Sequence, residues 1–233
     1  MNYNSYPQEY TATITARTSQ TMKRVYVNMT LALVVTAFVS LWCAGSEAFL
    51  SFISTNRWAM WALLIAEIGI VLGISAGINK LSNTTATLLF YLFAVINGAA
   101  LAPIFLVYKG ASIAKTFFIT AGTFGAMSVY GYFTSSDLSR IGNILIMALF
   151  GLIIASVVNI FAHSDTLQWI ISIAGVVIFV GPTAWDTQQI KRMAEQMPEA
   201  GVGRLAVLGA LSLYLDFINL FLYLLRFFGS SRD

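Results

Sequence analysis

Long apolar runs separated by short polar segments fill most of the 233-residue chain. They occupy residues 25–44, 58–78, 86–107, 113–133, 141–162, 167–185 and 206–228. Each run approaches the roughly 20 residues that a helix needs to cross a hydrocarbon core about 30 Å thick. The runs are continuous rather than alternating, which excludes the strands of a barrel. The pattern predicts an all-α membrane protein, a bundle of seven transmembrane helices.

The composition supports the same class, because 58% of the residues are hydrophobic and only 10% are charged. A soluble protein carries roughly 25% charged residues to cover its surface, so lipid must be the main solvent here. The net charge of +3 is dispersed, with no basic run interleaved with aromatic residues, and we expect no nucleic-acid partner. Cys43 and His163 are the only residues of their kinds, which argues against a disulfide, a zinc site and any cofactor.

The polar residues 1–24 predict a flexible N-terminal tail, followed by a seven-helix domain over residues 25–229. With the N-terminus inside, eight Lys and Arg residues fall on the cytoplasmic side and five on the other. This bias favours a cytoplasmic N-terminus. We therefore expect a multi-pass protein of the cell's inner (plasma) membrane.

Acidic residues inside the apolar runs are the candidates for function, since an ionised side chain at mid-membrane costs about 3 kcal/mol or more. Asp216 lies near the centre of the last run. A spacing of three or four residues places it on one face of the predicted helix with four other polar side chains: Ser212, Asn219, Tyr223 and Arg226. For Ser212, Asn219 and Tyr223, interhelical hydrogen bonding and pore lining are equal alternatives. For Asp216 we favour a functional role.

Asp186 ends the sixth run, four residues after Pro182, which predicts a kink or gap in that helix. A carboxylate beside a broken helix suits a cation site, although an interfacial aspartate would explain the position equally well. Glu67 lies in the middle of the second run, without a basic residue within one turn. Arg226 is a candidate partner for Glu67, unless its side chain reaches outward to the membrane surface instead.

Three glycines at four-residue spacing, Gly69, Gly73 and Gly77, mark the second run. Small residues at this spacing let two helix backbones approach closely. They predict tight packing of this helix rather than chemistry.

The last run has a recognisable sequence, GALSLYLDFINLFLYLLRFFG at residues 209–229. It resembles the closing helix of the Bax inhibitor-1 family of membrane proteins. Three further stretches support the likeness: GPTAWDTQQIK at 181–191, AEIGIVLGIS at 66–75 and NGAALAPIF at 97–105. The resemblance extends from residue 23 to residue 228. It implies a bacterial member of the family, with the last of seven helices at the centre of the bundle.

The resemblance also implies a function, a pH-sensitive calcium leak. Two aspartates on the sixth and seventh helices of the family share a proton and gate the pore; by motif they fall on Asp186 and Asp216. With nearby oxygen atoms, we expect the two carboxylates to form a weak, transient Ca²⁺ site. Glu67 and Arg226 match positions of an ion pair in the family. The family's latch arginine near the end of the second helix has only Lys80 nearby here, and a lysine cannot make the bidentate contact of an arginine.

Counting residues from the ends of the apolar runs places the two aspartates at different depths in the membrane. At 1.5 Å per residue Asp216 is about 15 Å deep, while Asp186 is near the membrane edge. The two meet only if the sixth helix tilts, kinks at Pro182 or continues beyond Trp185.

Other functions remain as alternatives. Some family members are binding partners that restrain a membrane-anchored protease or modulate a stress response, and the tail of residues 1–24 suits such a contact. A proton-coupled exchanger is another possibility. An intramembrane aspartyl protease would need Gly-x-Gly before Asp216, where this chain has Leu213, Tyr214 and Leu215, so we do not expect an enzyme.

Overall fold

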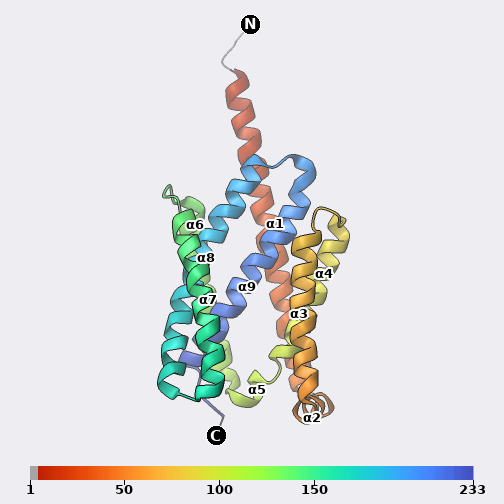
Figure 1. The fold of residues 1–233 in the computed structure, drawn as a ribbon. Coiled ribbons are helices and arrows are strands. Elements are labelled where there is room, and N and C mark those ends of the chain that lie inside the picture. Colours follow the sequence, from red (N-terminus) through yellow and green to blue (C-terminus); the bar gives the residue numbers. More distant parts are fainter. Residues whose placement is uncertain (1–4, 233) are drawn as a thin grey trace. The chain divides into compact units, whose positions relative to one another are not determined.

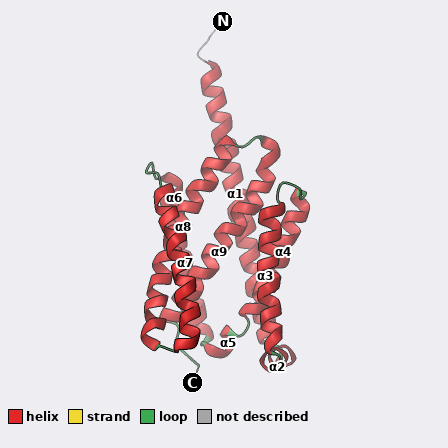
Figure 2. Cartoon of the chain, in the orientation of Figure 1, coloured by secondary structure: helices red, strands yellow, loops and turns green. Residues whose placement is uncertain are grey.

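The structure is a computed structural model that describes the backbone of residues 5–232 and the side chains of residues 12–56 and 58–232. Within this part of the chain every regular element is a helix, and the one β feature is an isolated antiparallel bridge between Tyr108 and Ser231 (Figure 2). The predicted all-α class is therefore confirmed.

Figure 1 follows the helices along the chain, and each predicted apolar run lies in one or two of them. The helices are α1 (Ser5–Ala44), α2 (Glu47–Thr55), α3 (Arg57–Gly77), α4 (Asn83–Leu101), α5 (Ile104–Val107), α6 (Gly110–Phe133), α7 (Ser139–Ala162), α8 (Asp165–Gln196) and α9 (Val202–Phe228), with a 3₁₀ turn at Glu199–Gly201 before α9.

Six of the described helical segments are long and apolar enough to span a membrane, so the predicted number of seven is approximate. The one predicted run outside this set lies in α6, whose 24 residues would be about 36 Å long at 1.5 Å per residue. Its length suffices, but its composition is less apolar. The last helix α9 is the most buried candidate: 72% of its apolar window is buried, against 33% or less in the other five. This agrees with the predicted central position of the last helix.

The N-terminal segment differs from the flexible tail predicted over residues 1–24. Helix α1 begins at Ser5, and Thr18, Thr21 and Met22 are buried. The Thr21 hydroxyl donates to the Arg17 carbonyl oxygen (2.9 Å), and the Arg17 guanidinium donates to the Glu195 carbonyl oxygen (3.3 Å). Polar residues therefore continue the helix because they have partners within the protein. Residues 1–4 lie outside the described part.

The described chain divides into two compact units. The first unit holds the residues up to Ala102 together with Gln189–Ser212, and the second holds Pro103–Gln188 together with the residues from Leu213 onward. Helices α8 and α9 contribute residues to both units.

In the first unit, α4 packs against both α1 and α3. Gly98 makes the α1–α4 contact close, because a Cβ atom there would lie 2.7 Å from the Thr36 carbonyl oxygen. The Thr36 hydroxyl adds a hydrogen bond to the Ala94 carbonyl oxygen (2.9 Å). The tight packing predicted for α3 is not found at Gly69 or Gly73, since no described atom lies within 4 Å of a Cβ built there. In this unit the close contact between helices is made by Gly98 of α4 instead.

In the second unit, glycines again bring helices together. A Cβ atom at Gly131 of α6 would collide with the backbone of Ala184 in α8, and one at Gly142 of α7 would collide with the Trp185 ring. Gly175 of α8 faces the Tyr223 ring of α9 in the same way. An apolar cluster on α7, α8 and α9 completes this packing: Leu152, Ile171, Phe179, Leu220 and Leu224.

The C-terminal segment of the second unit is bound to the loop between α5 and α6. The Lys109 amide donates to the Ser230 carbonyl oxygen (3.1 Å), and the Ser230 amide donates to the Ser112 hydroxyl (2.9 Å). Arg232 donates from its amide to the Val107 carbonyl oxygen and from its guanidinium to the Phe105 carbonyl oxygen, each at 2.8 Å. Residues 230–232 therefore close this part of the fold.

Candidate functional site

Asp216 lies in the middle of α9, where nearly every neighbouring residue is apolar and buried. Only 8% of the residue is exposed. Its Oδ2 atom is buried and has no hydrogen-bond partner among the described residues. Buried polar oxygens are nearly always hydrogen-bonded, so this carboxyl group is unusual and marks a candidate site.

Asp186 lies on α8, whose helix continues unbroken through Pro182 and ends only at Gln196. The predicted gap at Pro182 is therefore wrong, and the helix does not end near Asp186, as the apolar run does. Of the three ways in which counting allowed the aspartates to meet, continuation beyond Trp185 is the one observed. The Asp186 carboxylate lies close enough to act electrostatically on Asp216.

The turn of α8 around Asp186 is polar and buried. Thr183 and Thr187 are fully buried, and the Thr183 hydroxyl donates to the Phe179 carbonyl oxygen (3.1 Å). The Gln188 side chain accepts from the Leu138 amide (3.0 Å) and donates to the Ser136 carbonyl oxygen (2.8 Å). Gln188 thus binds the α6–α7 loop to the helix two residues after Asp186. Sequence reasoning missed this role, although a glutamine beside an intramembrane acid was a visible signal.

The other members of the α9 stripe have partners of several kinds. Ser212 is half-buried and belongs to the first unit. The Asn219 amide donates to the Leu215 carbonyl oxygen in its own helix (2.8 Å). The Tyr223 ring stacks on Phe179, with the ring centroids 5.5 Å apart. These contacts fit structural hydrogen bonding and packing, and pore lining by Ser212, Asn219 and Tyr223 stays a prediction.

Glu67 and Arg226 each have a neighbour other than the predicted one. Glu67, half-buried on α3, accepts a hydrogen bond from the Asn97 amide of α4 (3.0 Å). Exposed Arg226 places its guanidinium 5.6 Å from the centre of the Tyr223 ring. Glu67 belongs to the first unit and Arg226 to the second, so their ion pair stays a prediction. Lys80 is exposed after the end of α3.

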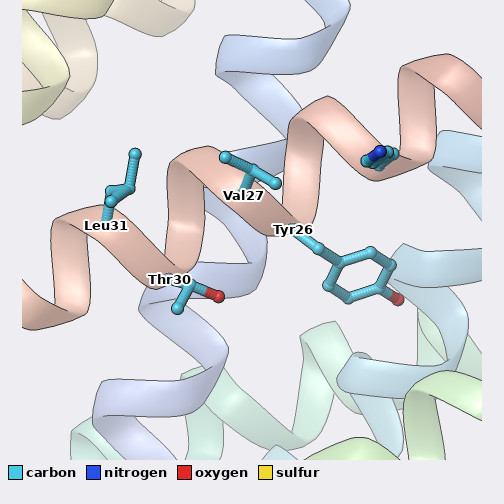
Figure 3. A pocket seen from close by; sticks show the side chains of 5 residues that line it. Tyr26, Val27, Thr30 and Leu31 are labelled. Carbon is cyan, nitrogen blue, oxygen red and sulfur yellow. The ribbon is translucent and has the colours of Figure 1, made fainter.

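A shallow hollow of about 300 Å³ lies on α1, lined by residues of that helix alone: Lys23, Tyr26, Val27, Thr30 and Leu31 (Figure 3). None of the predicted site residues lines it. Among the described residues, no group of three or more His, Cys, Asp and Glu side chains gathers as a metal site would require. The aspartate pair of the second unit is therefore the candidate site that geometry favours.

Comparison with known proteins gives one family and several close relatives. The family described as "Inhibitor of apoptosis-promoting Bax1" matches residues 18–233. The "Inner membrane protein YbhL" of Escherichia coli (strain K12) is 50% identical over 214 residues, which cover 91% of this chain and 92% of that protein. An uncharacterized protein of Borreliella burgdorferi is 44% identical over the same shares of the two chains. The uncharacterized protein RP147 of Rickettsia prowazekii is 40% identical over 213 residues, covering 91% and 90%.

Proposed function

Because the chain belongs to the Bax inhibitor family of membrane proteins, we propose that it is a pH-sensitive calcium leak channel gated by Asp186 and Asp216. One observation carries this proposal. The Asp216 carboxyl group is buried, one of its oxygens lacks a hydrogen-bond partner among the described residues, and a second carboxylate acts on it from α8.

The proposed gate follows from the repulsion between the two acids. Two carboxylates in contact in a poorly solvated site cannot both ionise at low cost, so the pair holds one proton. Loss of that proton leaves two like charges on α8 and α9, which favours a separated arrangement of the helices. The protonation state of the pair thus biases the closed conformation against the open one.

Calcium suits this site as a passing ion rather than as a resident one. Two carboxylates offer four oxygen atoms, whereas Ca²⁺ prefers six to eight oxygen ligands. Water and nearby hydroxyl or carbonyl oxygens would complete the shell. A weak site of this kind favours permeation, because an ion that is held tightly does not leave.

We further propose that the chain lies in the inner membrane with its N-terminus in the cytoplasm. The name of the Escherichia coli relative, an inner membrane protein, supports the location. The excess of Lys and Arg on the N-terminal side of the bundle supports the orientation.

The test is calcium entry into liposomes that contain the purified protein and a trapped calcium dye, from about pH 6 to about pH 8. Wild type is compared with Asp186→Asn, Asp216→Asn and the double variant. The wild-type flux should depend on pH, and the double substitution should abolish that dependence. Glu67→Gln is the matched control, because it neutralises an intramembrane acid but keeps the oxygen that accepts from Asn97.

Two results would contradict the proposal. Unchanged pH dependence in the double variant would remove the gate from the aspartates. No flux above that of empty liposomes at any pH would reject the leak itself, and would favour the alternative of a membrane binding partner that modulates a protease or a stress response.

A further inference from the structure

The buried face of helix α6 carries several hydroxyl groups. Its buried residues recur every three or four positions, and three of them carry hydroxyl groups: Ile113, Thr116, Thr120, Phe124, Ser128 and Gly131. Most large exposed side chains of the same helix, such as Phe118 at 74% exposure, are apolar. The hydroxyl groups on its buried face help explain why α6, although long enough to span a membrane, is less apolar than the other candidates.

Two of these hydroxyls have no hydrogen-bond partner among the described residues. The Thr120 hydroxyl donates to the Thr116 carbonyl oxygen (2.8 Å). The Thr116 and Ser128 hydroxyls have no such partner in the described part of the chain, although these residues are only 1% and 6% exposed. Leaving a buried hydroxyl unpaired is costly, and ordered water usually satisfies such a group.

Ser128 lies between two contacts of α6 with the segments that carry the aspartates. One turn before it, the Phe124 ring packs on Phe217 of α9, with the centroids 5.5 Å apart. Nearly one turn after it, Gly131 lies directly against Ala184 of α8. Phe217 follows Asp216 in the chain, and Ala184 precedes Asp186 by two residues. The free hydroxyl of Ser128 therefore lies between the contacts of α6 with the two segments that carry the acids.

An aromatic contact separates Ser128 from the other free hydroxyl. Phe124 falls between Thr116 and Ser128 on the buried face, and these two are about 18 Å apart along the helix at 1.5 Å per residue. Phe217 also packs on Phe117, with the centroids 5.3 Å apart. Narrow apolar constrictions stop ions by excluding water.

We propose that the buried face of α6 lines the ion path, with the Thr116 and Ser128 hydroxyls binding the water that accompanies the ion and the Phe124–Phe217 contact forming the apolar barrier between them. The inference rests on the proposed leak, since it assigns further residues to the same path. In this arrangement the Phe124–Phe217 barrier lies on one side of the aspartate pair. The aromatic rings close the path, and the protonation of the acids controls whether it opens.

Water access along α6 can be measured without any ion flux. In a Cys43→Ala background, Thr116→Cys and Ser128→Cys are treated in liposomes with a small charged methanethiosulfonate reagent. Phe118→Cys is the matched control, on the same helix but facing outward. A thiol reacts as the thiolate, which forms only where water reaches it, so we expect modification about tenfold faster at Thr116→Cys and Ser128→Cys than at Phe118→Cys. Each is repeated with Phe124→Ala, which should accelerate the reaction further.

Modification of Thr116→Cys and Ser128→Cys no faster than that of Phe118→Cys, with and without Phe124→Ala, would overturn the inference even if calcium flux is present. If Thr116→Cys and Ser128→Cys are modified quickly but no variant shows calcium flux, the water-lined α6 face is supported and the proposed leak is rejected. Phe124→Ala should also raise calcium flux several-fold, whereas Phe118→Ala should not change it. An unchanged flux in Phe124→Ala would remove the barrier from this residue.

Discussion

Glu67 in the first unit and Asp216 in the second are both acids within apolar helices, but their oxygens have different surroundings. Glu67 accepts a hydrogen bond from the neutral amide of Asn97. Asp216 has a buried oxygen without a partner in the described part of the chain, and the nearby charged group is another acid. The Glu67 oxygen therefore has a hydrogen-bond donor within the fold. The Asp216 oxygen needs a proton, a water molecule or a cation as its partner.

The difference shows why an acid in a membrane helix is not by itself evidence of a gate. Because the Asn97 amide carries no charge and lies on a neighbouring helix, the Glu67 contact stabilises the α3–α4 pair. At Asp216 the described residues supply no partner for the Oδ2 atom. The charge of this carboxyl group therefore depends on whether a proton, water or a cation binds there. We therefore expect a structural role for Glu67, whereas the surroundings of Asp216 support the proposed proton-dependent function.

The largest effect is expected where the packing of the second unit leaves no space. Gly131→Ala places a methyl group against the Ala184 backbone, which cannot rotate away, and should destabilise the protein by about 3 kcal/mol. Thermal unfolding in detergent measures this loss. Gly125→Ala on the same helix is the control, since no described atom lies within 4 Å of that position. Equal stability of the two variants would contradict the close α6–α8 contact.

The comparison of the two acids is tested directly by replacing each with leucine. Glu67→Leu leaves the Asn97 amide without its acceptor and should cost about 2 kcal/mol of unfolding free energy. Asp216→Leu removes a carboxyl group that repels Asp186, so its effect should be near zero or stabilising. Unfolding of both variants at one pH measures the contrast, and a larger loss for Asp216→Leu would reverse our assignment.

A smaller effect is expected at Gln188, which supports the Asp186 turn of α8. Gln188→Ala removes two hydrogen bonds to the α6–α7 loop and should cost about 1–2 kcal/mol. Hydrogen exchange should rise at the Leu138 amide, the donor to Gln188. Gln189→Ala, the neighbouring glutamine, serves as the control. Unaltered exchange at Leu138 would show that the loop does not depend on this side chain.

The smallest effect is expected at Arg226, whose contact with Tyr223 is exposed. Arg226→Gln should cost about 0.5–1 kcal/mol, the usual range for a cation over an aromatic ring near water. A double-mutant cycle with Glu67→Gln tests the predicted ion pair, since residues without a shared contact give additive effects. Additive effects would leave Asn97 as the functional neighbour of Glu67.

Hydropathy predicted the helices well, because long apolar runs leave few alternatives in lipid. The end of α8 was missed because Gln188, Gln189, Lys191 and Arg192 are polar, and Pro182 suggested a break. These polar residues are nevertheless good helix formers, a property that a hydropathy pattern ignores. The same error concealed how Asp186 reaches Asp216.

Partners across helices were harder to predict than the helices themselves. Asp216 was identifiable as a single acid in an apolar run, but the choice of Asn97 for Glu67 depends on how α3 and α4 pack. Glycine spacing likewise could not distinguish the open Gly69 from the tightly packed Gly98. A pattern along one helix shows which residues share a face, and it does not show what that face meets.

The hydrogen bonds of the C-terminal segment set an order on the protein's biosynthesis. The backbone groups of Val107 and Lys109 that pair with Arg232 and Ser230 stay without those partners until residues 230–232 have been translated. The ribosome must add more than a hundred residues between the two halves of this contact, as the separation of 118 between Ser112 and Ser230 shows. The second unit therefore completes these contacts only after residues 230–232 have been synthesised, although its first helix is made much earlier.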